Sequence, residues 1–139
     1  MKQETPEKVI TVPEDSCFYH PETPEAREAW RALVRTQAAL GGDALIGRRL
    51  YPLLAGAGFR EVSVSPRMVY ADESRPGVQE GFVQRTIVPM VDGARERAVR
   101  LGLVDPATFD RGVADLRRAG GPGGTFCYTF FRATGVNPG

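Results

Sequence analysis

The sequence predicts an α/β fold with three strands and a helical insertion before the last of them. Three observations indicate this class: short β-branched or alternating runs, amphipathic helical stretches between them, and a glycine-rich break directly before the final strand. With 139 residues, 42% of them hydrophobic and 25% charged, the chain has the size and composition of one globular domain. We therefore expect a single domain over residues 1–139, with residues 1–8 as a polar lead-in.

The first strand and the first helix are predicted from local signals. Val9–Val12 is a short β-branched run, which predicts a strand buried on both faces. Residues 14–21 follow it and predict a loop. Thr23 is expected to cap a helix whose first residue is Pro24, because a threonine side chain accepts from the free N–H groups of a helix start.

A second helix and a second strand complete residues 9–70. Asp43 is expected to cap the helix, and Gly58 supplies the left-handed residue that ends it. Residues 61–70 alternate as a strand does, but Pro66 interrupts them and indicates an edge position, since proline has no N–H to donate. The helices between the two strands make a connection long enough for the strands to be parallel.

The last part of the chain predicts a helical insertion and a final strand. The insertion spans residues 78–119, with a kink expected at Pro89 and a new helix start at Asp105. The core face of this last helix is predicted to carry Phe109, Val113 and Leu116. Residues 125–133 have large apolar groups on both alternating faces, which is typical of a strand in the middle of a sheet.

Charge and hydropathy exclude several classes of partner. Eighteen Lys and Arg against 17 Asp and Glu give a net charge of +1, so no nucleic-acid footprint is expected. The longest uncharged stretch, Ala119–Phe131, has 13 residues, whereas a membrane-spanning helix needs about 20. We expect no membrane partner and a cytoplasmic protein. Cys17 and Cys127 lie far apart in the sequence, so no metal site is expected.

Two segments resemble a known family. The run GRRLYPLLAGAGFREVSV at residues 47–64, after Gly41-Gly42-Asp43, and the run TFCYTFFR at residues 125–132 resemble class I S-adenosylmethionine-dependent methyltransferases of the small-molecule type. The resemblance covers the C-terminal half of that Rossmann-like fold. It implies that the three strands are the fifth, sixth and seventh of the family. The seventh is then antiparallel and lies between the other two, in a mixed sheet, and the insertion covers the acceptor substrate.

The sequence departs from the family at the cofactor site. The family binds its methyl donor in the first half of the fold, on a glycine-rich turn after a strand, and no such turn is present here. The glycines at 120–124 precede a strand instead. The resemblance implies S-adenosylmethionine as the family's cofactor, yet we expect none bound by this chain alone. The expected function is the substrate-side half of a small-molecule methyltransferase, inactive without a donor-binding half. The alternative is a non-catalytic module for small-ligand binding or dimerisation.

Candidate site residues lie first in the segment after the first strand. Ligands of open α/β sheets bind beyond the carboxyl ends of parallel strands, which is where residues 14–21 are expected. His20, with an ordinary pKa of about 6.5, is the candidate base for an acceptor hydroxyl. The alternative is a local hydrogen bond in a turn. Asp15 and Tyr19 are candidate substrate-binding residues, supported by the family's placement of this loop beside the acceptor.

A second group of candidate substrate-binding residues is mostly apolar and flexible enough to form a lid over an apolar ligand. Its members are Arg67, Tyr70, Phe82 and Met90, and Tyr128 on the last strand is a further candidate substrate-binding residue. The alternative for the aromatic and methionine side chains is ordinary core packing. Tyr128 is singled out on the last strand because its hydroxyl can reach a pocket.

The partner prediction follows from the first strand. In the resembled fold, a fourth strand pairs with the fifth, and no such strand is predicted here, so Val9–Val12 should expose a free backbone edge. We expect a homodimer or association with a donor-binding methyltransferase half. A small apolar ligand is the other expected partner.

Overall fold

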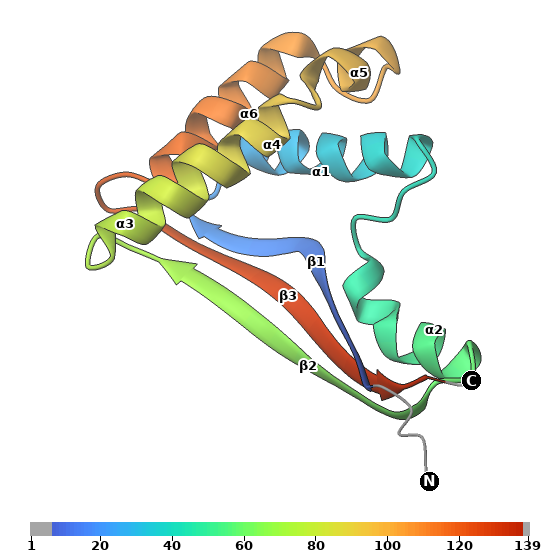
Figure 1. The fold of residues 1–139 in the computed structure, drawn as a ribbon. Coiled ribbons are helices and arrows are strands. Elements are labelled where there is room, and N and C mark those ends of the chain that lie inside the picture. Colours follow the sequence, from blue (N-terminus) through green and yellow to red (C-terminus); the bar gives the residue numbers. More distant parts are fainter. Residues whose placement is uncertain (1–6, 138–139) are drawn as a thin grey trace, which may run out of the picture. The chain divides into compact units, whose positions relative to one another are not determined.

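The computed structural model describes residues 7–137, with the backbone alone described at residues 13–15. Figure 1 shows the elements in chain order. The strands are β1 (Glu7–His20), β2 (Arg60–Ala71) and β3 (Thr125–Val136), and the helices are α1 (Pro24–Ala39), the 3₁₀ helix η1 (Ile46–Arg49), α2 (Leu50–Gly56), α3 (Pro76–Val78), the π-helix η2 (Gln79–Ile87), α4 (Val88–Asp92), α5 (Arg95–Arg100) and α6 (Pro106–Ala119). The expected α/β class is confirmed.

The three described strands form one sheet in the order β1-β3-β2. The last strand therefore lies in the centre, as its apolar residues on both faces predict. The arrows in Figure 1 show β3 running opposite to β1 and β2. The expectation of a mixed sheet is wrong: β1 and β2 share a direction, but each pairs with β3 rather than with the other. Every strand pair in the sheet is consequently antiparallel.

Strand β1 is longer than the sequence predicts. The expected loop at residues 14–21 is wrong, because the strand continues through Pro13 to His20. An edge strand tolerates proline, since an N–H on its outer side has no ladder partner to lose. Burial on both faces is also wrong: Val9 is 54% exposed and Thr11 is exposed, while Ile10 is half-buried. Alternate burial and exposure is typical of an antiparallel strand with one covered face.

Strand β2 occupies the opposite edge of the sheet, where Pro66 is expected to place it. The proline does not interrupt it, because the strand is continuous over Arg60–Ala71. Both outer strands of the described sheet therefore contain a proline, and the central strand contains none.

The chain divides into two compact units, and each strand contributes residues to both. The described part of the first unit comprises residues 7–16, 44–68 and 129–137. It holds η1 and α2, with Leu50 buried. The expected cap at Asp43 is wrong: Leu45 precedes η1 and makes no side-chain cap bond. Gly58 has the expected left-handed conformation, with φ +93°.

The second unit comprises residues 17–43 and 69–128 and contains α1 and the helices from α3 to α6. Both predicted caps in it are confirmed: Thr23 accepts from the N–H of Ala26 at the start of α1, and Asp105 accepts from the N–H of Thr108 at the start of α6. The core face predicted for α6 is buried, at Phe109, Val113 and Leu116. The capping residues of α1 and α6, the two longest helices of the second unit, can therefore be identified from the local sequence.

The insertion expected at 78–119 is helical. It begins with a continuous helical run, α3–η2–α4, whose middle is a π-helix. The π register ends next to Pro89, the position where a kink is expected. Two glutamines of η2 hold the chain segment before β3: Gln84 Nε2 donates to the carbonyls of Arg117 (2.9 Å) and Gly120 (3.0 Å), and Gln79 Nε2 donates to that of Gly121 (3.1 Å). The carbonyls of Arg117 and Gly121 also accept from the backbone N–H groups of Gly120 and Gly124, so the glutamine bonds add to the backbone bonds of this segment.

Within residues 7–137, none of the helices combines the length and apolar character needed to cross a membrane.

Candidate functional site

Five aromatic side chains of unit 2 contact one another, and we call them the aromatic cluster. They come from four elements that are distant in the sequence. The members are Tyr19 on β1, Trp30 on α1, Phe82 on η2, and Phe126 and Tyr128 on β3. Phe126 and Tyr128 lie two residues apart on one strand, so they share a face of the sheet. The helical insertion and the last strand thus both supply residues to one site.

Phe126 is the centre of this cluster. Its ring stacks on that of Tyr19, with centroids 5.8 Å apart and planes 15° from parallel. Trp30 lies 6.1 Å away at 52°, and Phe82 lies 6.4 Å away with its edge toward the ring. Phe82 also meets Tyr128 edge-on at 5.7 Å. Aromatic pairs favour these offset-stacked and edge-to-face arrangements because of the ring quadrupole.

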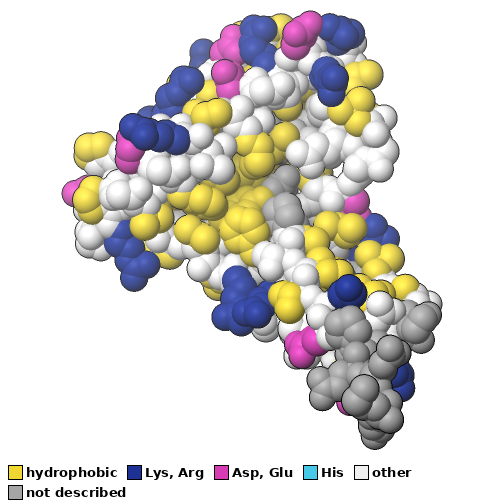
Figure 2. Space-filling view, in the orientation of Figure 1, with side chains coloured by type: hydrophobic (Ala, Val, Ile, Leu, Met, Phe, Trp, Pro, Cys, Tyr) yellow, Lys and Arg dark blue, Asp and Glu magenta, His cyan; other side chains and the backbone are white. Residues whose placement is uncertain are grey.

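Burial differs across the aromatic cluster. Phe126 and Tyr128 are 1% and 2% exposed, and Trp30 is 8% exposed. Tyr19 and Phe82 are only half-buried. Figure 2 shows hydrophobic side chains gathered beside the helical run α3–α4 of this unit. The aromatic cluster therefore has a buried inner part and two half-buried rings at its outer margin.

The hydroxyl of Tyr19 is the cluster's unusual polar group. Its oxygen is buried and has no hydrogen-bond partner in the described part of the chain. Burial, together with the nearby negative charges of Cys17 and Glu22, raises the pKa of Tyr19 far above its ordinary value of 10.0. The phenol is consequently neutral at physiological pH. A buried hydroxyl that lacks a partner costs free energy, because the group has given up its bonds to water.

Three of the predicted substrate-binding residues meet in the aromatic cluster: Tyr19, Phe82 and Tyr128. Sequence reasoning did not assign Trp30 or Phe126 to the site, because both have the spacing of ordinary core residues. The signal that could have found Phe126 is its alternation with Tyr128 on a strand that begins shortly after the predicted lid.

The other predicted site residues lie elsewhere. His20 is exposed at the end of β1, in a strand rather than in the expected loop, and the side chain of Asp15 is outside the described residues. Met90 is half-buried on α4. Tyr70 is 40% exposed on β2, where a hydrogen bond to the carboxylate of Asp72 raises its pKa. Arg67, also exposed on β2, belongs to the first unit and not to the second.

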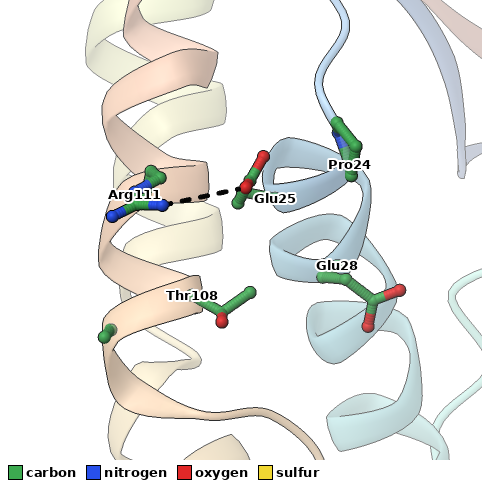
Figure 3. A pocket seen from close by; sticks show the side chains of 6 residues that line it. Pro24, Glu25, Glu28, Thr108 and Arg111 are labelled. Carbon is green, nitrogen blue, oxygen red and sulfur yellow. Dashed lines mark ion pairs between the residues drawn. The ribbon is translucent and has the colours of Figure 1, made fainter.

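A small pocket of about 190 Å³ lies between the first turns of α1 and α6. In Figure 3, Glu25 and Arg111 extend toward each other from these two helices, and their ion pair spans 3.9 Å. The Arg111 side chain is 71% exposed, so water screens the pair and it adds little stability. The pocket lies where these two helices pack together.

A second pocket, of about 300 Å³, lies between the turn after β2 and the glycines before β3. Its carboxylates already have partners within the protein: Asp72 accepts from the N–H of Ser74 at 2.9 Å, and Glu73 accepts from the N–H of Gly123. The bonds from Ser74 hold the pKa of Asp72 below its ordinary value. These carboxylates therefore order the turn.

Across residues 7–137, no group of three or more His, Cys, Asp and Glu side chains is placed to hold a metal ion. The chain matches no protein-family model, and no curated protein matches its sequence significantly. The geometry of the aromatic cluster thus carries the functional argument.

Proposed function

We propose that this chain is the substrate-side half of an S-adenosylmethionine-dependent methyltransferase acting on a small molecule, and that the aromatic cluster forms a wall of the acceptor site. The observation that carries the proposal is the composition of the cluster: the insertion supplies Phe82, and the last strand supplies Phe126 and Tyr128. In the resembled family, the insertion covers the acceptor. The strand order β1-β3-β2 supports the same assignment, because it is the order that the resemblance implies.

The aromatic cluster can hold a planar, uncharged acceptor. The five rings pack on one another at 5.7 to 6.4 Å, so an acceptor would make its stacking and edge contacts with the half-buried rings of Tyr19 and Phe82. None of the five side chains carries a charge at neutral pH. Fixing an acceptor in one orientation raises the rate of a transfer reaction by proximity, even where no acid or base takes part. His20 stays the candidate base for an acceptor hydroxyl.

The residues of this chain do not fit the cofactor. The glycine turn at 120–124 precedes a strand and not a helix, and its polar groups are already engaged by the side chains of Gln79, Gln84 and Glu73. We therefore assign methyl-donor binding to a second polypeptide segment, which supplies the donor-binding half. This chain contributes the acceptor site.

Two titrations test this assignment. The chain contains one tryptophan, so its indole N–H gives a single resonance that reports on the aromatic cluster. We expect 2-naphthol, a planar uncharged ring, to shift this resonance. Calorimetry with S-adenosylmethionine and S-adenosylhomocysteine should show no binding to the chain alone. Micromolar cofactor binding would contradict the missing donor half, and an unmoved Trp30 resonance would contradict the acceptor site.

The catalytic part of the proposal needs a separate assay. The partner to try is a polypeptide encoded next to this chain that carries a glycine-rich nucleotide turn. Radiolabelled methyl transfer to a hydroxylated planar ring should occur only when both polypeptides are present. If ring binding is seen but the mixture transfers no methyl group, the chain is a ligand-binding module without chemistry.

The edges of the sheet favour a second candidate function, dimerisation. Strand β1 lies at an edge of the described sheet, and Val9 on it is 54% exposed. An unpaired strand edge recruits a further strand, and a second copy of β1 is the occupant that we propose. Light scattering should then show a homodimer, and Ile10→Pro should abolish it by removing a ladder N–H. A monomer at high concentration would contradict the dimer, and the acceptor-site proposal would stand unaffected.

A further inference from the structure

We propose that the side chain of Tyr19 occupies a binding site for an aromatic ring on the face of Phe126, and that a planar, uncharged ligand ring binds there by displacing it. The inference rests on the acceptor site proposed above and says how a ligand enters it. The side chain of Tyr19 therefore fills the ring-binding site when no ligand is present.

The geometry of the Tyr19–Phe126 pair supports this role. Of the five ring contacts described above, four have planes 52° to 70° apart, whereas the Tyr19–Phe126 pair is close to parallel at 15°. Stacking at 5.8 Å is also one of the two arrangements that a free planar ring favours on a phenylalanine. Trp30 and Phe82 approach Phe126 at an angle, so they form the walls of the site while Tyr19 covers its face.

The hydroxyl makes the stacked position of Tyr19 a costly one. Its oxygen is buried without a hydrogen-bond partner, although the ring itself is only half-buried. If the side chain rotates away from Phe126, the hydroxyl regains water and the ring loses its stacking contact. A ligand ring with no polar group at that point restores the stacking contact without the penalty. The exchange of rings therefore relieves the penalty of the buried hydroxyl.

The position of Tyr19 in the sheet permits this rotation. The residue is the last but one in β1, an edge strand with β3 on one side only. Its neighbour Phe18, on the opposite face of the strand, is 73% exposed. Phe126, in contrast, is 1% exposed on the central strand. One ring of the stacked pair is thus fixed, and the other can move without disturbing the strand order.

The test compares three variants by the Trp30 indole resonance, with 2-naphthol as the planar probe and 2-decalol, its saturated and non-planar counterpart, as the control ligand. Tyr19→Ala empties the face of Phe126, so the variant should bind 2-naphthol about fivefold more tightly than the wild type, or better. Tyr19→Phe removes the penalty and keeps the ring, so it should bind about fivefold more weakly. Tyr51→Phe, at a residue of α2 that is 56% exposed, should match the wild type. The affinity for 2-decalol should be the same for the wild type and for all three variants.

The order of affinities decides the outcome. If Tyr19→Ala binds no more tightly than the wild type, or if Tyr19→Phe binds equally well, the inference is wrong. If the Tyr19 hydroxyl bonds directly to the ligand, both variants should bind 2-naphthol more weakly than the wild type. That result would also overturn the inference. Should Tyr19→Ala fail to fold, Tyr19→Phe decides alone, because it preserves the packing.

Failure of the inference differs from failure of the proposed function. In the first case the affinity order is flat while the wild type still binds 2-naphthol. In the second case the affinity order holds, but the mixture with a donor-binding polypeptide transfers no methyl group.

Discussion

The hydroxyl of Thr23 donates to Oδ2 of Asp115 at 2.7 Å while it accepts from the N–H of Ala26 at 3.0 Å. One side chain therefore caps α1 and joins the start of that helix to α6. The two residues are 92 positions apart in the sequence, so the cap is a tertiary contact as well as a local one.

Thr23→Ala should remove both hydrogen bonds. We expect the free energy of unfolding to fall by about 1 to 3 kcal/mol, because the cap is lost and the half-buried Asp115 loses a partner. Thr23→Ser keeps the hydroxyl and should recover most of the loss. Urea denaturation followed by circular dichroism measures the difference, and equal stability of the Ala and Ser variants would refute the double role.

Gly112→Ala should force α1 and α6 apart. A Cβ atom at this position would collide with the carbonyl oxygen of Glu25 and lie 2.8 Å from Cβ of Ala29. Overpacking of this kind costs about 1 to 3 kcal/mol. Gly81→Ala is the matched control, since a Cβ there meets nothing within 4 Å. Thermal unfolding of the two variants should show a lowered Tm for Gly112→Ala alone.

Alkaline pH should destabilise the protein through Tyr19. The pKa of this phenol is raised in the folded state, mainly by burial, so the unfolded state loses its proton first. The free energy of unfolding should therefore decline as the pH rises above the ordinary tyrosine value of 10.0. Urea midpoints measured from neutral to alkaline pH should decline less steeply for Tyr19→Phe than for the wild type. The control Tyr51→Phe should follow the wild type, and identical slopes for all three proteins would contradict the burial of the hydroxyl.

Acid should weaken the ion pair between Asp110 and Arg95. The guanidinium holds the carboxylate with two bonds, 2.6 Å from Nε and 3.0 Å from Nη2, and these lower the pKa of Asp110. The stability that the pair contributes is present above the ordinary value of 3.8 and is lost as the pH falls through the lowered pKa. Asp110→Asn should therefore have a lower urea midpoint than the wild type at pH 7, and the same midpoint in strong acid. Because both groups are exposed, added salt should reduce the shift, and a shift that persists in acid would assign it to packing.

The elements that the sequence predicts well depend on local contacts. The caps at Thr23 and Asp105 bond to a backbone N–H three residues away, so their signal lies within a short window. The length of β1 depends instead on its pairing with β3, from the far end of the chain. Pro13 ends the predicted strand, whereas in the structure β1 continues through it as an edge strand of the described sheet, a position that tolerates proline.

In the candidate site, too, the local features can be predicted from the sequence and the long-range contacts cannot. Tyr19, Phe82 and Tyr128 are each recognisable as aromatic residues at suitable places in the sequence. Their meeting in the aromatic cluster follows from strand order and helix packing, which residue spacing does not encode. The unpartnered hydroxyl of Tyr19 was also beyond prediction, because it results from the positions of all the surrounding atoms.

The order β1-β3-β2 has a consequence for the synthesis of the protein. The strand that joins the two outer strands is the last of the three to leave the ribosome, so β1 and β2 emerge without a partner in this sheet. Contacts between distant parts of a chain form slowly. Nascent chains that end before Thr125 should therefore carry exposed apolar strands and bind chaperones that capture such segments, and their release should coincide with the appearance of β3.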